Sequence, residues 1–86
     1  MNERHHYNAG IRVTAKSRVG AFGDVLSVLT NMKINVSEMN AREAEDGHSD
    51  LFLTISVSSA GQMELVLSRI LRVDGVIQAR RIVAGG

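Results

Sequence analysis

The first regular pattern along the chain is a strict alternation that begins at Ile11. Ile11, Val13 and Ala15 are apolar and the residues between them are polar, which is the period of a half-buried β-strand. The mostly polar residues 1–8 that precede it are expected to form a flexible lead-in. We therefore place the start of the ordered domain at residue 9.

Two later stretches repeat with the period of a helix. The first apolar stripe consists of Phe22, Val25, Leu26, Leu29 and Met32 or Lys33. The second consists of Met63, Val66, Leu67, Ile70 and Leu71. Ser59 followed by Gln62 has the spacing of a capping box at the start of this second helix, and Asp74-Gly75 is expected to end it.

Three further strands are expected from the remaining apolar positions. One starts at Ile34, and its apolar phase slips between Val36 and Met39, which predicts a β-bulge near residues 37–38. Asp46-Gly47 is a strong hairpin signal, and the alternation over residues 51–57 after it predicts the clearest strand. A last strand covers residues 76–83, with apolar residues in both phases, so its facing stays open.

The resulting order is strand, helix, strand, strand, helix, strand. Right-handed crossovers around a central hairpin give an α+β fold, a ferredoxin-like βαββαβ sandwich. In this arrangement both helices cover one face of a four-stranded antiparallel sheet, with the first and third strands at its centre. Residues 9–84 are expected to form one domain.

Composition narrows the range of functions. The chain has 86 residues, ten basic and nine acidic, for a formal net charge of +1, which excludes a strongly cationic domain but allows a local basic patch. The absence of cysteine excludes disulfides and thiolate chemistry. No apolar run approaches the roughly 18 residues of a membrane span, and the polar start is unlike a signal peptide. We expect a soluble cytoplasmic domain.

The candidate catalytic and metal-binding residues do not form a convincing site. His5 and His6 lie in the polar lead-in, and His48 lies beside the expected hairpin turn. Asp46, His48 and Asp50 could be combined into a metal site, but ligands need support from surrounding residues, and we favour a solvated turn. We therefore expect no catalytic residue, no metal and no cofactor.

One face of the predicted sheet carries features of nucleic-acid binding. RNA-recognition domains share this order of elements, and the face opposite the helices should display basic residues beside one aromatic. However, the paired aromatics that stack bases are missing, so we favour a solvated face or an oligomer contact over RNA binding. The candidate residues for RNA contact are Arg12, Lys16, Phe52 and Arg80, with Thr14 and Thr54 beside them.

The segment "KSRVGAF" joins the first strand to the first helix. Free N–H groups at a helix start attract anions such as carboxylates, and Gly20 would let a ligand approach the backbone. The alternative is that Gly20 only permits the turn. If the ligand is an amino acid, Asn35 offers a side-chain carbonyl to its ammonium group.

These motifs resemble an ACT domain, the small regulatory module of many amino-acid-controlled enzymes. Arg18-Val19-Gly20 matches the Asp-Arg-x-Gly of that family, and Ile34-Asn35-Val36 matches the start of its second strand. "KINVSEMNAR", "LFLTISV" and "VIQARR" are similar to the C-terminal ACT domain of RelA/SpoT-type enzymes, the GTP pyrophosphokinases that make and hydrolyse (p)ppGpp. Ser17 replaces the usual aspartate, and Ala21-Phe22 replaces a common leucine pair.

The resemblance implies a non-catalytic module that controls the catalytic domains of a stringent-response enzyme by sensing a small ligand or through regulatory contacts. An RNA- or ribosome-contacting domain of the same enzyme and a plain dimerisation module remain alternatives. The implied ligand-binding residues are Ser17, Arg18, Val19, Gly20, Ala21, Phe22 and Asn35. ACT-like domains often pair through the second strand, so a homodimer is expected to form through Val36, Ser37, Glu38, Met39, Asn40 and Ala41.

Overall fold

The computed structural model describes residues 6–16, 20–44 and 46–82, and it contains the six elements that the sequence predicts in the same order. They are β1 (Tyr7–Ala15), α1 (Ala21–Asn31), β2 (Asn35–Glu43), β3 (Ser49–Val57), α2 (Ala60–Leu71) and β4 (Val76–Ile82). β1 begins at Tyr7, so two residues of the expected lead-in pair with β3. No helix within the described ranges is long and apolar enough to cross a membrane.

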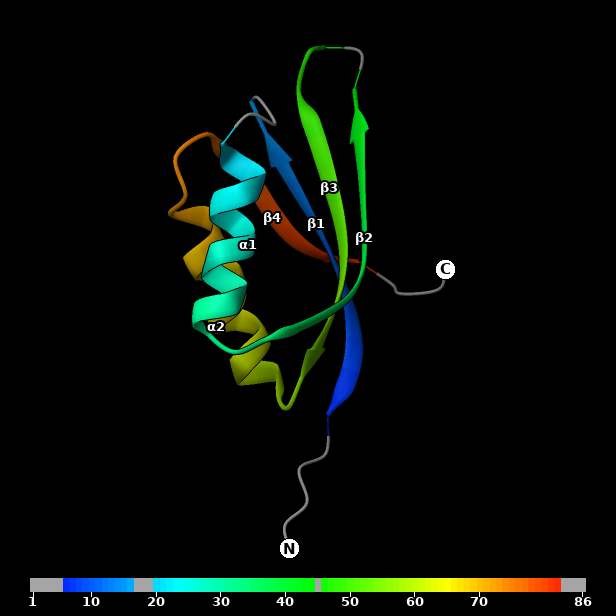
Figure 1. Cartoon of the computed structure of the whole chain (residues 1–86), viewed down its shortest axis with the longest axis vertical. Helices are drawn as coiled ribbons and strands as arrows, with labels where there is room; N and C mark the ends of the chain where they lie inside the picture. Colours follow the sequence, from blue (N-terminus) through cyan, green and yellow to red (C-terminus); the bar gives the residue numbers. More distant parts are fainter. Residues whose placement is uncertain (1–5, 17–19, 45, 83–86) are drawn as a thin grey trace, which may run out of the picture.

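The strands form one antiparallel sheet in the order β2-β3-β1-β4. Both helices cover the same face of this sheet, and the other face is open (Figure 1). The predicted ferredoxin-like topology is therefore confirmed, with β1 and β3 at the centre and β2 and β4 at the edges.

The strand register sorts side chains between the two faces. Ile11 lies opposite Leu53 beneath the helices, and the next pair, Arg12 opposite Phe52, lies on the open face. The facing of β4, which the sequence left open, is decided by its pairing with β1. Arg80 lies opposite Arg12 on the open face, because facing residues in neighbouring strands share one side of the sheet.

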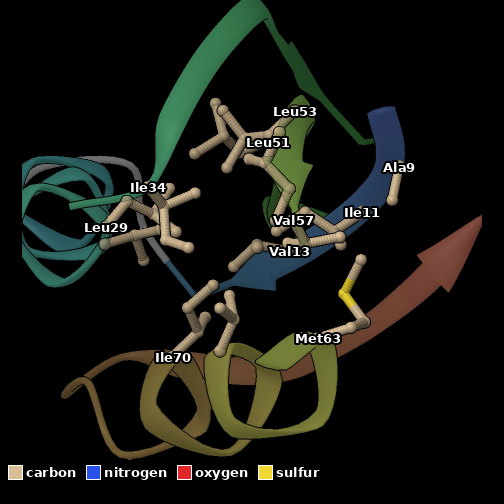
Figure 2. Packing of buried hydrophobic residues seen from close by; sticks show 13 residues of the cluster. Ala9, Ile11, Val13, Leu29, Ile34, Leu51, Leu53, Val57, Met63 and Ile70 are labelled. Carbon is tan, nitrogen blue, oxygen red and sulfur yellow. The ribbon is translucent and has the colours of Figure 1, made fainter. Parts of the chain in front are cut away.

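The core lies between the helices and the two central strands. Figure 2 shows Met63 and Ile70 of α2 and Leu29 of α1 pointing toward the side chains of β1 and β3. Leu53 is only 2% exposed, and Leu26 packs against the same cluster, as the topology requires. The inward stripe predicted for α2 is wrong at one residue. Leu71 is 47% exposed, because it lies about 100° around the helix from Ile70.

The β-bulge and the helix cap predicted from local sequence signals are both present in the structure. Val36 pairs with Ile55 and Glu38 with Thr54, so Ser37 is the extra residue of the expected bulge. Ser59 caps α2, with its Oγ accepting a hydrogen bond from the Gln62 N–H at 3.1 Å. The Gln62 side chain accepts from the Ser58 N–H at 2.7 Å, one residue earlier than in the standard capping box.

Candidate functional site

Gly20 occupies a backbone conformation that the turn before α1 requires. Its φ of 82° and ψ of −39° lie in a region that other residues enter only with strain. A Cβ at this position would meet no atom within 4 Å, so space does not select glycine here. The three preceding candidate residues, Ser17, Arg18 and Val19, lie outside the described residues.

The start of α1 keeps backbone donors that no side chain caps. Ala21 and Phe22 are the first two residues of α1, so their N–H groups lie in the first turn, where no intrahelical carbonyl accepts them. Such donors, together with the positive end of the helix dipole, favour an anion. Asp24 also lies in this first turn, and its negative charge opposes the binding of a second carboxylate there.

The junction packs against the turn between α2 and β4. The Lys16 N–H donates to the carbonyl oxygen of Gly75 at 2.8 Å, and a Cβ built on Gly75 would lie 3.7 Å from the Cβ of Ala21. A ligand at the junction would therefore lie close to the segment that leads into β4. Lys16 directly follows the last residue of β1 and has no register partner in the sheet, so it is not assigned to the open face.

Asn35 lies at the far end of α1 from Gly20. Gly20 directly precedes the helix, and Asn35 begins β2 after the helix has ended. Eleven helical residues separate the two ends by about 16 Å, and Figure 1 shows α1 beginning at one end of the molecule and β2 starting near the other. One protomer alone does not bring these two residues together around a small ligand.

The edge strand β2 contributes almost nothing to the core. Eight of its nine residues are exposed and Val36 is half-buried. Met39 is 57% exposed, although its register partner Leu53 is buried beneath the helices. Beside this edge is an open hollow of about 300 Å³, lined by Leu26, Val36, Ser37, Glu38 and Met39. The expected dimer residues therefore form an accessible, partly apolar edge.

The open face brings together three of the four residues expected to contact RNA. Phe52, Arg12 and Arg80 lie opposite one another on β3, β1 and β4. The guanidinium carbons of Arg12 and Arg42 each lie 5.8 Å from the centroid of the Phe52 ring. Arg42 was missed from the sequence, although β2 alternation and the β2–β3 hairpin place it near Phe52.

Asp50 is a buried acid within this face, and the expectation that it belongs to a solvated turn is wrong. It is 6% exposed and accepts hydrogen bonds from the Arg12 guanidinium at 2.9 Å and the Thr14 hydroxyl at 2.7 Å. Burial raises the pKa of the Asp50 carboxyl, but these two hydrogen bonds and the charges of Arg12 and Arg42 outweigh it. The net effect is a pKa below the ordinary aspartate value.

Of the three residues considered as a metal site, only Asp46 and His48 lie together in the hairpin turn. Asp46 Oδ1 accepts from the backbone N–H of His48 at 3.1 Å, and its other oxygen lies 3.1 Å from His48 Nδ1. Asp50 points instead to β1, where Arg12 and Thr14 use both its oxygens. The turn is thus an Asx turn, and the three side chains are not gathered around one point.

Comparisons with known proteins identify the family of this chain. The model of the ACT domain family matches residues 3–81. The GTP pyrophosphokinase of Haemophilus influenzae is 27% identical over 77 residues, which cover 88% of this chain and 10% of that enzyme.

Solved structures show the same fold. The ACT domain from the GTP pyrophosphokinase of Chlorobium tepidum superposes with a TM-score of 0.78 at 22% identity, over 91% of this chain and all of that one. A homoserine dehydrogenase from Thiobacillus denitrificans matches with a TM-score of 0.74 at 19% identity, over 94% of this chain and 18% of its own. The fold, the matched motifs and the family model agree, and the chain belongs to the ACT domain family.

Proposed function

We propose that this ACT domain is the non-catalytic regulatory module of a cytoplasmic RelA/SpoT-type GTP pyrophosphokinase. The similarity to the Haemophilus influenzae enzyme supports this parent, and the chain spans about a tenth of that relative's length. A regulatory module must bind a ligand, a partner or a second copy differently in two states of its parent. The exposed edge strand β2 is the observation that carries the proposal.

The module acts as a symmetric dimer that pairs through β2. An edge strand with unpaired backbone groups is a template for another strand, and two copies of one edge satisfy each other in an isologous interface. The exposure of Met39 and the hollow beside Leu26 support apolar contact along this edge. Dimerisation would bury side chains of β2 that the protomer's own helices leave exposed.

The dimer also completes the proposed amino-acid site. Within one protomer, α1 holds Gly20 and Asn35 apart. In an antiparallel β2–β2 pairing the strands run in opposite directions, so Asn35 of the partner subunit comes to the end of the molecule where α1 begins. The free N–H groups at Gly20, Ala21 and Phe22 then receive the ligand's carboxylate, and the partner's Asn35 accepts from its ammonium group.

An NMR titration of the ¹⁵N-labelled chain with each of the twenty amino acids tests this site. We expect one of them, at about 10 mM for a weak site, to shift the amide signals of residues 20–22 and Asn35 together. Asn35→Ala should weaken the effect, while Asn8→Ala, an exposed amide on β1, should not.

The negative outcome is equally specific. If no amino acid shifts the signals at the β1–α1 junction, the junction is only a turn and does not bind a ligand. A dimer that is indifferent to every amino acid would then identify a dimerisation module. Gly20→Val is a poor probe of the site, because the positive φ of Gly20 would strain any other residue.

A further inference from the structure

The open face of the sheet carries a second surface, distinct from the junction, to which the edge strand β2 contributes Asn40 and Arg42. Its central row runs across all four strands, with Asn40, Phe52, Arg12 and Arg80 opposite one another in turn. Arg42 lies on the same face of β2 as Asn40, two residues further along the strand. Neither helix covers this face (Figure 1).

The positive charges on this face are not equivalent. Arg12 is neutralised by its ion pair with Asp50 at 2.9 Å. Arg42 and Arg80 are exposed, and within the described part of the chain neither has a carboxylate in ion-pair contact. They lie on the two edge strands, which are three strand spacings or about 14 Å apart. The face therefore presents two guanidinium groups without an ion-pair partner among the described residues: Arg42, whose guanidinium carbon lies 5.8 Å from the centroid of the Phe52 ring, and Arg80 on the opposite edge strand.

Apolar side chains fill the space between and beside these charges. Phe52 is half-buried and occupies the centre of the row. On β4, Ile82 lies on the same face as Arg80, and its side chain covers Gly10, where a Cβ would come within 3.0 Å of Cγ1. The face thus combines apolar contact points with two unpaired arginines, a pattern typical of protein interfaces.

We propose that this face docks an acidic protein segment, which lays an apolar side chain over Phe52 and Ile82 and pairs carboxylates with Arg42 and Arg80. Arg is suited to this role because its guanidinium forms two parallel hydrogen bonds with one carboxylate. Asp50 acts as a positioning residue. It holds Arg12 beside the Phe52 ring and neutralises the charge of that guanidinium.

The same observations disfavour RNA as the occupant. RNA-recognition domains stack bases on paired aromatics of the sheet, and Phe52 is the one aromatic that the described strands place on this face. Two free cations would release few counterions from a nucleic acid, and that release supplies most of the non-specific affinity.

An NMR titration of the ¹⁵N-labelled chain can separate the two occupants. The probes are a short amphipathic peptide of alternating glutamate and leucine pairs, its glutamine counterpart, and a single-stranded RNA of mixed sequence with similar length. The acidic peptide should shift the amide signals of Arg42, Phe52 and Arg80, and added salt should weaken it. The glutamine peptide and the RNA should bind at least severalfold more weakly.

Matched variants test whether the acidic peptide binds through the open face. Arg80→Gln and Arg42→Gln should each weaken the acidic peptide about two- to fivefold, as for exposed ion pairs, and the double variant should multiply the two effects. Arg81→Gln is the control, because Arg81 neighbours Arg80 on β4 but lies opposite Ile11 on the other face. The proposal is overturned by tighter binding of the RNA, by equal binding of the glutamine peptide, by an equal effect of Arg81→Gln, or by no shift at all.

Discussion

At the scale of single residues, the position of Asp50 in the fold is the one that its sequence neighbours predict least well. It lies in the polar run "EDGHSD", which is typical of a solvated turn. In the fold it is buried and joins β3 to β1 through Thr14 and Arg12, residues 36 and 38 positions away. Its removal would leave the Arg12 guanidinium without its carboxylate partner.

Asp50→Asn should lower the free energy of unfolding at neutral pH by about 1.5–3 kcal/mol, the usual range for hydrogen bonds to a charged group. Because the pKa of Asp50 is lower in the folded state, its contribution is complete above the unfolded pKa near pH 4. It is lost as the pH falls through the folded pKa. Urea denaturation at several pH values should show the difference from wild type shrinking in acid.

Asp74→Asn is the control for that measurement, since Asp74 is exposed and has no hydrogen bond or ion pair within the described residues. It should change the stability by less than about 0.5 kcal/mol. A deficit of Asp50→Asn that stays constant from neutral to acid pH would contradict the assigned role of the Asp50 charge.

Gly20 and Gly23 form a second matched pair at this scale. Gly20→Ala should cost about 1–3 kcal/mol, because alanine is strained at the φ of 82° found there. Gly23 lies within α1, and a Cβ added there would meet no atom within 4 Å. Gly23→Ala should therefore stabilise the domain by up to about 1 kcal/mol, since alanine favours helix. Thermal melts of both variants check the signs. A stable Gly20→Ala variant would show that this conformation is not required.

At the scale of elements, the contributions of the strands and helices to the core are unequal. β3 is buried along the whole face beneath the helices, whereas β2 is exposed along nearly its entire length. α1 and α2 each bury three residues. The stability of the isolated chain should therefore depend on β1, β3 and the inner sides of the helices.

Leu53→Ala in β3 should lower the free energy of unfolding by about 2–5 kcal/mol, as expected for a truncation that leaves a cavity in the core. Leu65→Ala removes the same atoms from α2, where the side chain is exposed, and should change it by less than about 0.5 kcal/mol. Chemical denaturation of the two variants measures the contrast. Similar costs at both positions would be inconsistent with the core described above.

At the scale of the whole molecule, the unpaired β2 edge predicts a dimer. Sedimentation should show a dimer at near-millimolar concentration. Met39→Lys should shift it toward monomer, because an edge lysine opposes strand pairing. Leu71→Lys changes another exposed apolar residue, at the end of α2, and should leave the dimer intact. If the wild-type chain remains monomeric at that concentration, the prediction of a dimer is wrong for the isolated domain.

The sequence by itself determined the order of elements, the bulge at Ser37 and the cap at Ser59, and the rules of chain topology then gave the order of the strands. The elements, the bulge and the cap depend on residues close together in the chain. Alternation, helical spacing and capping are short-range consequences of backbone geometry, so they can be read without knowing the fold. The motifs at Gly20 and Asn35 identified the family for the same reason.

Only the tertiary structure decided the facing of β4, the burial of Asp50 and the flanking of Phe52 by two arginines. It also separated Gly20 from Asn35 by the length of α1, so that a site using both residues needs a second copy. The first three of these features depend on register between strands distant in sequence. A shift of one residue would move every side chain to the other face, and the local pattern carries no record of which distant partner lies opposite.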